Sequence, residues 1–235
     1  MRNVVVSSAR KLTVSLATLA VALAVVLAGC ATETHRAVTP ETVSSAGTLY
    51  SGPRHTLVVG KFRNRSSYMQ GVFSDGTDRL GNQAKTLLEA HLNQTGRFAL
   101  VDRSNMDEIA REAKIAGTAQ TLIGASVAIT GDVTEFGRKT TGDVQLFGIL
   151  GQGKEQVAYS KVTLNVVDVA TSQILYSVHG AGEYALANRE VLGTGGTAGY
   201  DATLNGKVLD LAIREAVDRL VEGVERGAWS PTRAQ

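Results

Sequence analysis

The stretch AYSKVTLNVVDVATSQILYSVHGAGEYAL, residues 158–186, decides the fold. It contains two runs rich in β-branched and aromatic residues, and the polar residues around 170–172 separate them. Two such runs on either side of a polar turn are typical of paired β-strands. The sequence therefore predicts a long β-hairpin in the second half of the chain.

The residues around this hairpin show both strand and helix patterns. HTLVVGKF (55–62), RFALVD (97–102) and ASVAITGDVTEF (125–136) have strand composition. Apolar residues recur at helical spacing from Asp78 to Gly96, and residues 104–107 resemble a capping box that starts a second helix. An apolar helical face over residues 205–224 is formed by Val208, Leu211, Ala212, Val217, Leu220, Val221 and Val224. This order of elements predicts an α+β domain.

The N-terminal segment has the organisation of a secretory signal. Arg2, Arg10 and Lys11 precede the uncharged run LTVSLATLAVALAVVL (12–27), which small residues separate from Cys30. A transmembrane helix is the alternative, but the run is shorter than the roughly 20 residues that such a helix needs. We therefore expect a lipoprotein signal peptide at residues 1–29. Its removal takes three cations away, so the formal net charge falls from +2 to −1.

Cys30 is the only cysteine in the chain, and it ends the tetrapeptide LAGC (27–30). This tetrapeptide resembles the bacterial lipobox, in which the cysteine becomes the acylated first residue of the mature protein. We expect Cys30 to be a lipidation site rather than a buried small residue or a nucleophile, and we expect no disulfide. Ala31 follows it in place of an Asp, which resembles lipoproteins destined for the outer membrane. Residues 30–54 are expected to form an acylated tether or an arm that wraps a neighbour.

The remaining polar residues do not form a recognisable catalytic or metal site. The acids Asp132, Glu135 and Asp143 show no pairing on a substrate, and Asp102 with Arg103 is interpreted as a turn and helix start. GTGGTAG (193–199) lacks the ending of a phosphate-binding loop. No metal-ligand spacing links the four histidines, which are His35, His55, His91 and His179. His91 is expected on a helix surface. We expect no enzyme activity, no cofactor, no metal and no nucleic-acid partner.

Four segments occur in a characteristic order: VVGKFRNRS (58–66), TGRFALVDRSNMDEIAREAKI (95–115), ITGDVTEFGRK (129–139) and VTLNVVDVATSQILYS (162–177). Together with LDLAIREAVDRLV near the end, they resemble the CsgG family, the lipoproteins of the curli secretion channel and of related surface-anchoring systems. The resemblance covers nearly all of the mature chain. It implies a CsgG-like domain at residues 55–229, followed by a tail at 230–235.

The resemblance also implies an architecture. Family members have a periplasmic α/β sandwich domain with two β-hairpins, and a ring of identical subunits combines these hairpins into one transmembrane β-barrel. An unfolded amyloid or adhesin subunit crosses this barrel without ATP. The implied location is the outer membrane, with the lipid anchor, palmitate included, on the periplasmic side. Accessory proteins in the periplasm or outside the cell are the other implied partners.

Two segments are candidates for the hairpins, at residues 137–159 and 181–200. In the second, Tyr184 and Leu186 share one face while Glu183 and Arg189 share the other, and glycine and alanine dilute the apolar face. Both arms are short against the 9 to 11 residues of a membrane-spanning strand. The alternative is a pair of soluble loops on a non-pore periplasmic lipoprotein. Such a protein would be an interaction module that resembles activators of peptidoglycan synthases.

Family members narrow the channel with a loop between the first strand and the first helix. The corresponding stretch here is NRSSYMQGVFSDGTD (64–78), whose aromatic residues are Tyr68 and Phe73. The resemblance makes these two residues candidates for the pore constriction. The alternative is that they pack the loop onto the domain.

Overall fold

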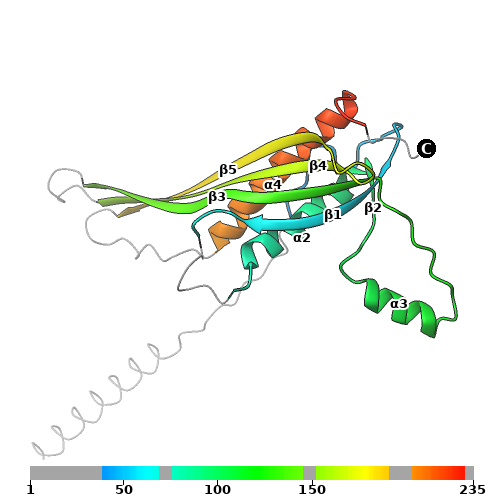
Figure 1. Cartoon of the computed structure of the whole chain (residues 1–235). Coiled ribbons are helices and arrows are strands. Elements are labelled where there is room, and N and C mark those ends of the chain that lie inside the picture. Colours follow the sequence, from blue (N-terminus) through cyan, green and yellow to red (C-terminus); the bar gives the residue numbers. More distant parts are fainter. Residues whose placement is uncertain (1–38, 69–75, 145–151, 191–202, 231–235) are drawn as a thin grey trace, which may run out of the picture. The chain divides into compact units, whose positions relative to one another are not determined.

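The hairpin predicted at residues 158–186 forms strands β4 (Gln152–Asp168) and β5 (Ile174–Glu190) of the computed structural model (Figure 1). Asp168 stabilises the turn, because its Oδ1 accepts hydrogen bonds from the backbone N of Thr171 at 2.8 Å and from its hydroxyl at 3.0 Å. Ser172 adopts a φ of 59°, a conformation typical of tight turns. The predicted strand–turn–strand pattern is confirmed.

The structure describes residues 39–68, 76–144, 152–190 and 203–230. Residues Glu41–Gln235 form one compact unit. The other elements described are β1 (His55–Asn64), α2 (Arg79–Thr95), β2 (Phe98–Leu100), α3 (Met106–Ile115), β3 (Val127–Val144) and α4 (Thr203–Glu225). Their order along the chain is the order predicted from the sequence.

The five strands form one mixed sheet in the order β2-β1-β3-β4-β5. β1 is parallel to both β2 and β3, while β3, β4 and β5 are successively antiparallel. The helices α2 and α4 pack against each other and cover one face of this sheet (Figure 1). The protein is therefore a mixed α/β fold in which the described helices leave the other face of the sheet uncovered.

The core lies between the sheet and these two helices. Alternate residues of β4 from Ala158 to Asp168 are buried, as expected for a strand with one covered face. The largest fully buried side chains include Leu57, Leu88, Leu92, Ile129, Leu164, Leu204, Leu209, Ile213 and Leu220. Leu204, Leu209 and Ile213 extend the α4 face beyond the residues predicted, because α4 contacts both the sheet and α2.

Two irregularities in the ladders keep apolar residues on the covered face. The register of β3 with β4 shifts between Val133 and Glu135, so that Phe136 is buried although it lies three residues after Val133. β1 has a similar shift between Val59 and Phe62, both of which are buried. An extra residue in a strand reverses its alternation. Both strands therefore bend without losing their core contacts.

The helix boundaries agree with the sequence for α2 and differ for α3. Asp78 accepts a hydrogen bond from Gly81 N at 2.7 Å, and Gly96 ends α2 at a φ of 65°. For α3, the predicted capping box is wrong, because Asn105 is the N-cap and its side chain makes no cap bond. Asp102 instead accepts from the backbone N of Ser104 at 2.7 Å, which confirms its turn role. This hydrogen bonding, from Asn105 first, also lowers the pKa of Asp102.

Candidate functional site

α4 crosses the sheet in the direction opposite to β5, and its first turns mark where the helical cover ends. Nε of Arg138 on β3 donates to Oδ1 of Asn205 at 2.8 Å. On β5, the ring centre of Tyr184 lies 5.3 Å from Nζ of Lys207. Since α4 begins at Thr203, the sheet residues beyond Arg138 and Tyr184 lie past the N-terminal end of the helix.

β3, β4 and β5 continue past this level as a three-stranded antiparallel ribbon (Figure 1). Their ladders run to the pairs Val144↔Gln152 and Gln152↔Glu190. We term residues 139–144, 152–157 and 185–190 the strand extension. It is a direct continuation of the domain's own strands, so its direction is fixed by the folded core.

The first predicted hairpin, residues 137–159, is present in the ladder of β3 and β4. Pairing runs from Gly137↔Tyr159 to the last pair of these strands. The second candidate, residues 181–200, begins as part of β5 and pairs with β4 rather than forming a separate hairpin in the described residues. Its second arm falls in 191–202, outside the described residues.

Close packing of α4 explains why glycines occur at the start of the second candidate hairpin, residues 181–200. A Cβ on Gly180 would collide with the carbonyl oxygen of Ala212, and one on Gly182 would lie 2.9 Å from the carbonyl oxygen of Val208. Gly180 and Gly182 therefore allow α4 to approach the sheet closely. The interpretation of a diluted lipid-facing surface is wrong at Gly182, which is buried beneath α4.

The uncovered face of the sheet carries paired polar side chains. Nζ of Lys161 lies 2.7 Å from Oε1 of Glu135. On the next strand pair, the Thr163 hydroxyl lies 2.9 Å from Nδ1 of His179. Such cross-strand pairs satisfy the polar groups of a face exposed to water. Two of the acids singled out in the sequence thus form ion pairs on the sheet surface, Glu135 with Lys161 and Asp132 with Arg65 at 3.3 Å. The side chain of Asp143 lies outside the described part of the structure.

Tyr68 lies at the base of the strand extension. Its ring packs on Phe136 with centroids 4.7 Å apart, and its hydroxyl accepts a hydrogen bond from Nδ2 of Asn205 at 2.7 Å. Asn205 also binds Arg138, so one amide links the loop, β3 and α4. In the single subunit, Tyr68 packs the start of its loop onto the domain, as in the alternative left open by the sequence. Phe73 lies outside the described residues.

The segment that links Cys30 to the domain is partly folded onto it. Cys30 itself lies outside the described residues. Val43 is buried in the core, and the backbone N and hydroxyl of Ser44 donate to the two carboxylate oxygens of Asp218, each at 2.9 Å. Glu41 forms an ion pair with Arg214. We term residues 41–54 the N-terminal arm, since the compact unit starts at Glu41 and not at residue 55.

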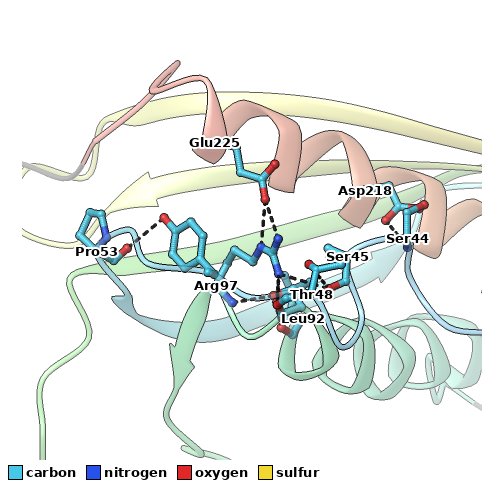
Figure 2. A network of polar contacts seen from close by, with 10 residues as sticks. Ser44, Ser45, Thr48, Pro53, Leu92, Arg97, Asp218 and Glu225 are labelled. Atoms are coloured by element: carbon cyan, nitrogen blue, oxygen red, sulfur yellow. Dashed lines mark hydrogen bonds and ion pairs between the residues drawn. The ribbon is translucent and has the colours of Figure 1, made fainter.

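Arg97 joins this arm to the C-terminal end of α4 (Figure 2). Its guanidinium donates to Oε1 of Glu225 at 2.7 and 3.0 Å and to the carbonyl oxygens of Ser45 and Thr48 at 3.1 and 3.2 Å. The Arg97 side chain is only 5% exposed. A buried cation requires such partners. No local sequence pattern indicates this network, because its members lie far apart along the chain.

These contacts fix the direction of the N-terminal arm. As the chain runs from Glu41 to Thr48, its partners move along α4 from Arg214 to the Arg97–Glu225 pair. The arm therefore starts beside the middle of α4 and runs toward the C-terminal end of that helix. The strand extension projects past the opposite, N-terminal end of α4.

His91 is buried between α2 and α4, and the expectation that it lies on a helix surface is wrong. Its Nε2 lies 2.7 Å from Oδ1 of Asp210, and its Nδ1 lies 3.2 Å from Oε1 of Gln94. Burial alone lowers the pKa of His91, but hydrogen bonds to Asp210 and Gln94 and the negative charge of Asp210 outweigh it. The pKa is therefore raised. His91 is a helix-to-helix contact in the core.

Two further features bear on possible chemistry. Among the described residues, no three His, Cys, Asp or Glu side chains gather as they would around a metal ion. The described helices also include none with the length and apolar character of a membrane span.

Comparison with known proteins identifies the relatives of the chain. The family model described as curli production assembly/transport component CsgG matches residues 43–235. The protein NMB1126/NMB1164 of Neisseria meningitidis serogroup B, named as a candidate lipoprotein, is 60% identical over 221 residues, which cover 94% of this chain and 99% of that protein.

Solved structures with weaker likeness include the PelC dodecamer of Paraburkholderia phytofirmans, with a TM-score of 0.34, 16% identity and coverage of 72% of this chain and 93% of that one. Lipoprotein GNA1162 of Neisseria meningitidis has a TM-score of 0.32 and 15% identity, with coverage of 74% and 100%. The LpoB C-terminal domain of Escherichia coli has a TM-score of 0.31 and 16% identity, with coverage of 59% and 88%. On the family model and the 60% identical relative, the chain belongs to the CsgG family.

Proposed function

We propose that this protein is an outer-membrane lipoprotein whose copies form a ring-shaped secretion channel. The channel exports or anchors curli-like amyloid or adhesin subunits, which diffuse through it without ATP. The observation that carries this proposal is the strand extension, a three-stranded antiparallel ribbon that could form part of a β-barrel. Family membership supplies the expected client class.

The edges of the strand extension support an assembly of several copies. β1 pairs with β3 only as far as Asn64↔Val133, so the outer edge of β3 beyond that pair has no neighbouring strand in the described residues. β5 is the last strand of the sheet on the other side. Open strand edges are not stable in a lipid bilayer, because their backbone groups lack partners there. A closed barrel made from several copies would pair both edges.

The chain between Cys30 and the N-terminal arm is long enough to support a lipid anchor in the membrane that the strand extension would enter. About 11 residues separate Cys30 from Glu41, which allows a reach of at most about 36–40 Å. From Arg214 to the start of α4 is about 16 Å along the helix, and the six residues of 139–144 add about 20 Å. These distances total about 36 Å, within the reach of the tether. A lipid on Cys30 can therefore enter the same membrane as the strand extension.

Tyr68 and Phe73 remain our candidates for the pore constriction. The link from Tyr68 through Asn205 to Arg138 places the start of the loop at the level where the strand extension begins. In a ring, a loop at that level would surround the periplasmic entrance of the barrel. This geometry supports a constriction there.

The second candidate function is a non-pore periplasmic interaction module, and the length of the strand extension favours it. Six residues in each strand lie past the start of α4, against 9 to 11 for a membrane-spanning strand. In that case the extension would be a water-exposed ribbon that binds another envelope protein. The two functions differ in whether the extension enters lipid.

The direct test uses the acylated protein purified in detergent. Electron microscopy should show rings, and reconstitution into planar bilayers should give stepwise conductance. A matched variant replaces residues 140–156 with an Asn-Gly turn, which keeps the helical layer and removes the tip of the first hairpin. It should remain folded and lose conductance. A monomeric wild-type protein without conductance would contradict the channel and favour the interaction module.

A further inference from the structure

We propose that the segment around α3 is a subunit contact, which packs on the β4–β5 turn of the next copy in the ring. This inference rests on the proposed function, because it requires an oligomer. It assigns the contact to two named surfaces. We term residues 102–124 the α3 excursion and residues 169–174 the turn patch.

The α3 excursion exposes large apolar side chains to solvent in the single subunit. None of the ten residues of α3 is buried. Ile109 is 42% exposed and Ile115 is 73% exposed, and two more large apolar residues of the excursion, Leu122 and Ile123, are also exposed. Four exposed large apolar residues within one short segment support an interaction site there.

A helix of this length also needs support from packing. Isolated helices shorter than about 12–15 residues are marginal in water. α3 has only ten residues, and the side-chain hydrogen bonds that hold its flanking loops run from Arg103 to the carbonyl oxygen of Ile123 and from Lys85 on α2 to the hydroxyl of Ser104. The excursion has about as many residues as one side of a standard protein interface, which has roughly 20–30. A partner surface that covers it would be large enough for stable association.

The turn patch is suited to cover it. Val169 is 50% exposed and Ile174 is 59% exposed. The sequence from 169 to 182 contains no Asp, Glu, Lys or Arg. Edge strands usually carry charged residues that prevent pairing with other chains, and the start of β5 lacks this protection. Burial of the turn patch itself, residues 169–174, against apolar side chains would require no desolvation of a charge.

The positions of the two surfaces indicate a second copy as the partner. The excursion leaves β2 after Leu100 and returns to β3 at Val127, and both residues pair with Leu57. Val127 also pairs with Asp168, which precedes the turn patch. Both surfaces therefore lie at the same end of the sheet, but β2 and β5 form its opposite edges. A contact between two different surfaces of identical subunits is the kind that closes rings.

The test compares two charged double variants of the full acylated protein in detergent. Ile109→Asp with Ile115→Asp should reduce the fraction of ring at least tenfold in mass photometry. Asn82→Asp with Thr86→Asp adds the same charge at exposed positions of α2, outside both proposed surfaces, and should leave the ring intact. Circular dichroism and thermal melting check that each variant is folded.

Cysteine crosslinking makes the test independent of folding effects. A chain with both Ile115→Cys and Ile174→Cys should give a ladder of crosslinked species up to the ring under mild oxidation. Each single variant should give dimers at most. Native Cys30 would not interfere, since its sulfur carries lipid in the proposed protein.

The outcomes separate the two proposals. If the wild type and the Ile109/Ile115 variant both form rings and no ladder appears, the α3 contact is wrong and the channel proposal stands. Such a result would leave the excursion as a site for a different envelope protein. If the wild type is monomeric, the channel proposal fails, and the α3 contact fails with it.

Discussion

Two helices of the molecule differ sharply in their packing. α4 packs closely on β5 of the sheet, whereas α3 lies in the connection between β2 and β3 of the same sheet. Ile213 of α4 is fully buried, and Gly180 of β5 allows the helix to approach the strand backbone. Ile115 of α3 is 73% exposed, and no residue of that helix is buried. The first region is complete within one subunit. The second has the composition of a contact without its partner.

This difference indicates which region stabilises the subunit and which is available for assembly. The α4–β5 region supplies stability and sets the direction of the strand extension. The α3 excursion adds little to the stability of one subunit, so its apolar residues are available for assembly. Substitutions in the α4–β5 region should therefore lower the stability of the subunit. Substitutions in the α3 excursion should reduce ring formation and leave that stability nearly unchanged.

The largest effect is expected from matched isoleucine truncations. Ile213→Ala should lower the free energy of unfolding by about 4 kcal/mol, because it leaves a cavity in the core. Ile115→Ala should change it by less than about 0.5 kcal/mol, because the side chain is exposed. Urea unfolding of the monomeric form measures both. Equal losses at the two positions would contradict the comparison.

A pair of glycine substitutions tests the same difference between the α4–β5 region and the α3 excursion. Gly180→Ala should cost at least about 3 kcal/mol, because the new methyl group would collide with the α4 backbone. Gly124 has open space around its Cβ position and no positive φ, so Gly124→Ala should have an effect of less than about 0.5 kcal/mol. Thermal and urea unfolding provide the measurement. A neutral Gly180→Ala would show that α4 is not packed closely on β5.

The N-terminal arm should show an intermediate effect, since polar contacts hold most of it. Arg97→Gln removes the ion pair with Glu225 and should cost about 2 kcal/mol. It should also expose residues 41–54 to limited proteolysis. Arg226→Gln is the control, because its ion pair with Glu222 is exposed and worth less than about 1 kcal/mol. An arm that stays protected after Arg97→Gln would mean that Val43 and the contacts of Glu41 and Ser44 with α4 are enough to hold it.

The smallest effect is a pH dependence at His91. Its pKa in the folded protein is raised above 6.5, so the protonated ring adds stability that is complete below pH 6.5 and is lost as the pH rises through the raised pKa. The difference in unfolding free energy between wild type and His91→Gln should therefore shrink between pH 6 and pH 8.5. Urea unfolding at several pH values measures it. A difference that grows with pH would contradict the assignment.

The sequence was sufficient for features that depend on local patterns. The two β-branched and aromatic runs around a polar turn in residues 158–186 predicted β4 and β5, and Asp78 and Gly96 marked both ends of α2. The predicted hairpin at 137–159 was found with its pairing. In each case, the residues that determine the structure are near one another along the chain.

Features that depend on distant residues could not be predicted in this way. His91 is buried because Asp210 on α4 provides its partner, and Arg97 binds an arm about 50 residues away and a helix end more than 100 residues away. Gly182 appeared to weaken a lipid-facing strand because the sequence did not show that α4 covers it. A glycine pair spaced by two in a strand, with Ala212 and Ala216 in a later helix, was the available signal.

Entry of the strand extension into the lipid bilayer can be measured with single cysteines at residues 139–144 of the acylated protein. Each cysteine is labelled with an environment-sensitive fluorophore in liposomes, and a lipid-borne quencher is added. We expect quenching that alternates with a period of two along these residues and is absent at Thr163 on the uncovered face of the sheet. Water-like emission without quenching at all six positions would show that the extension stays outside the membrane.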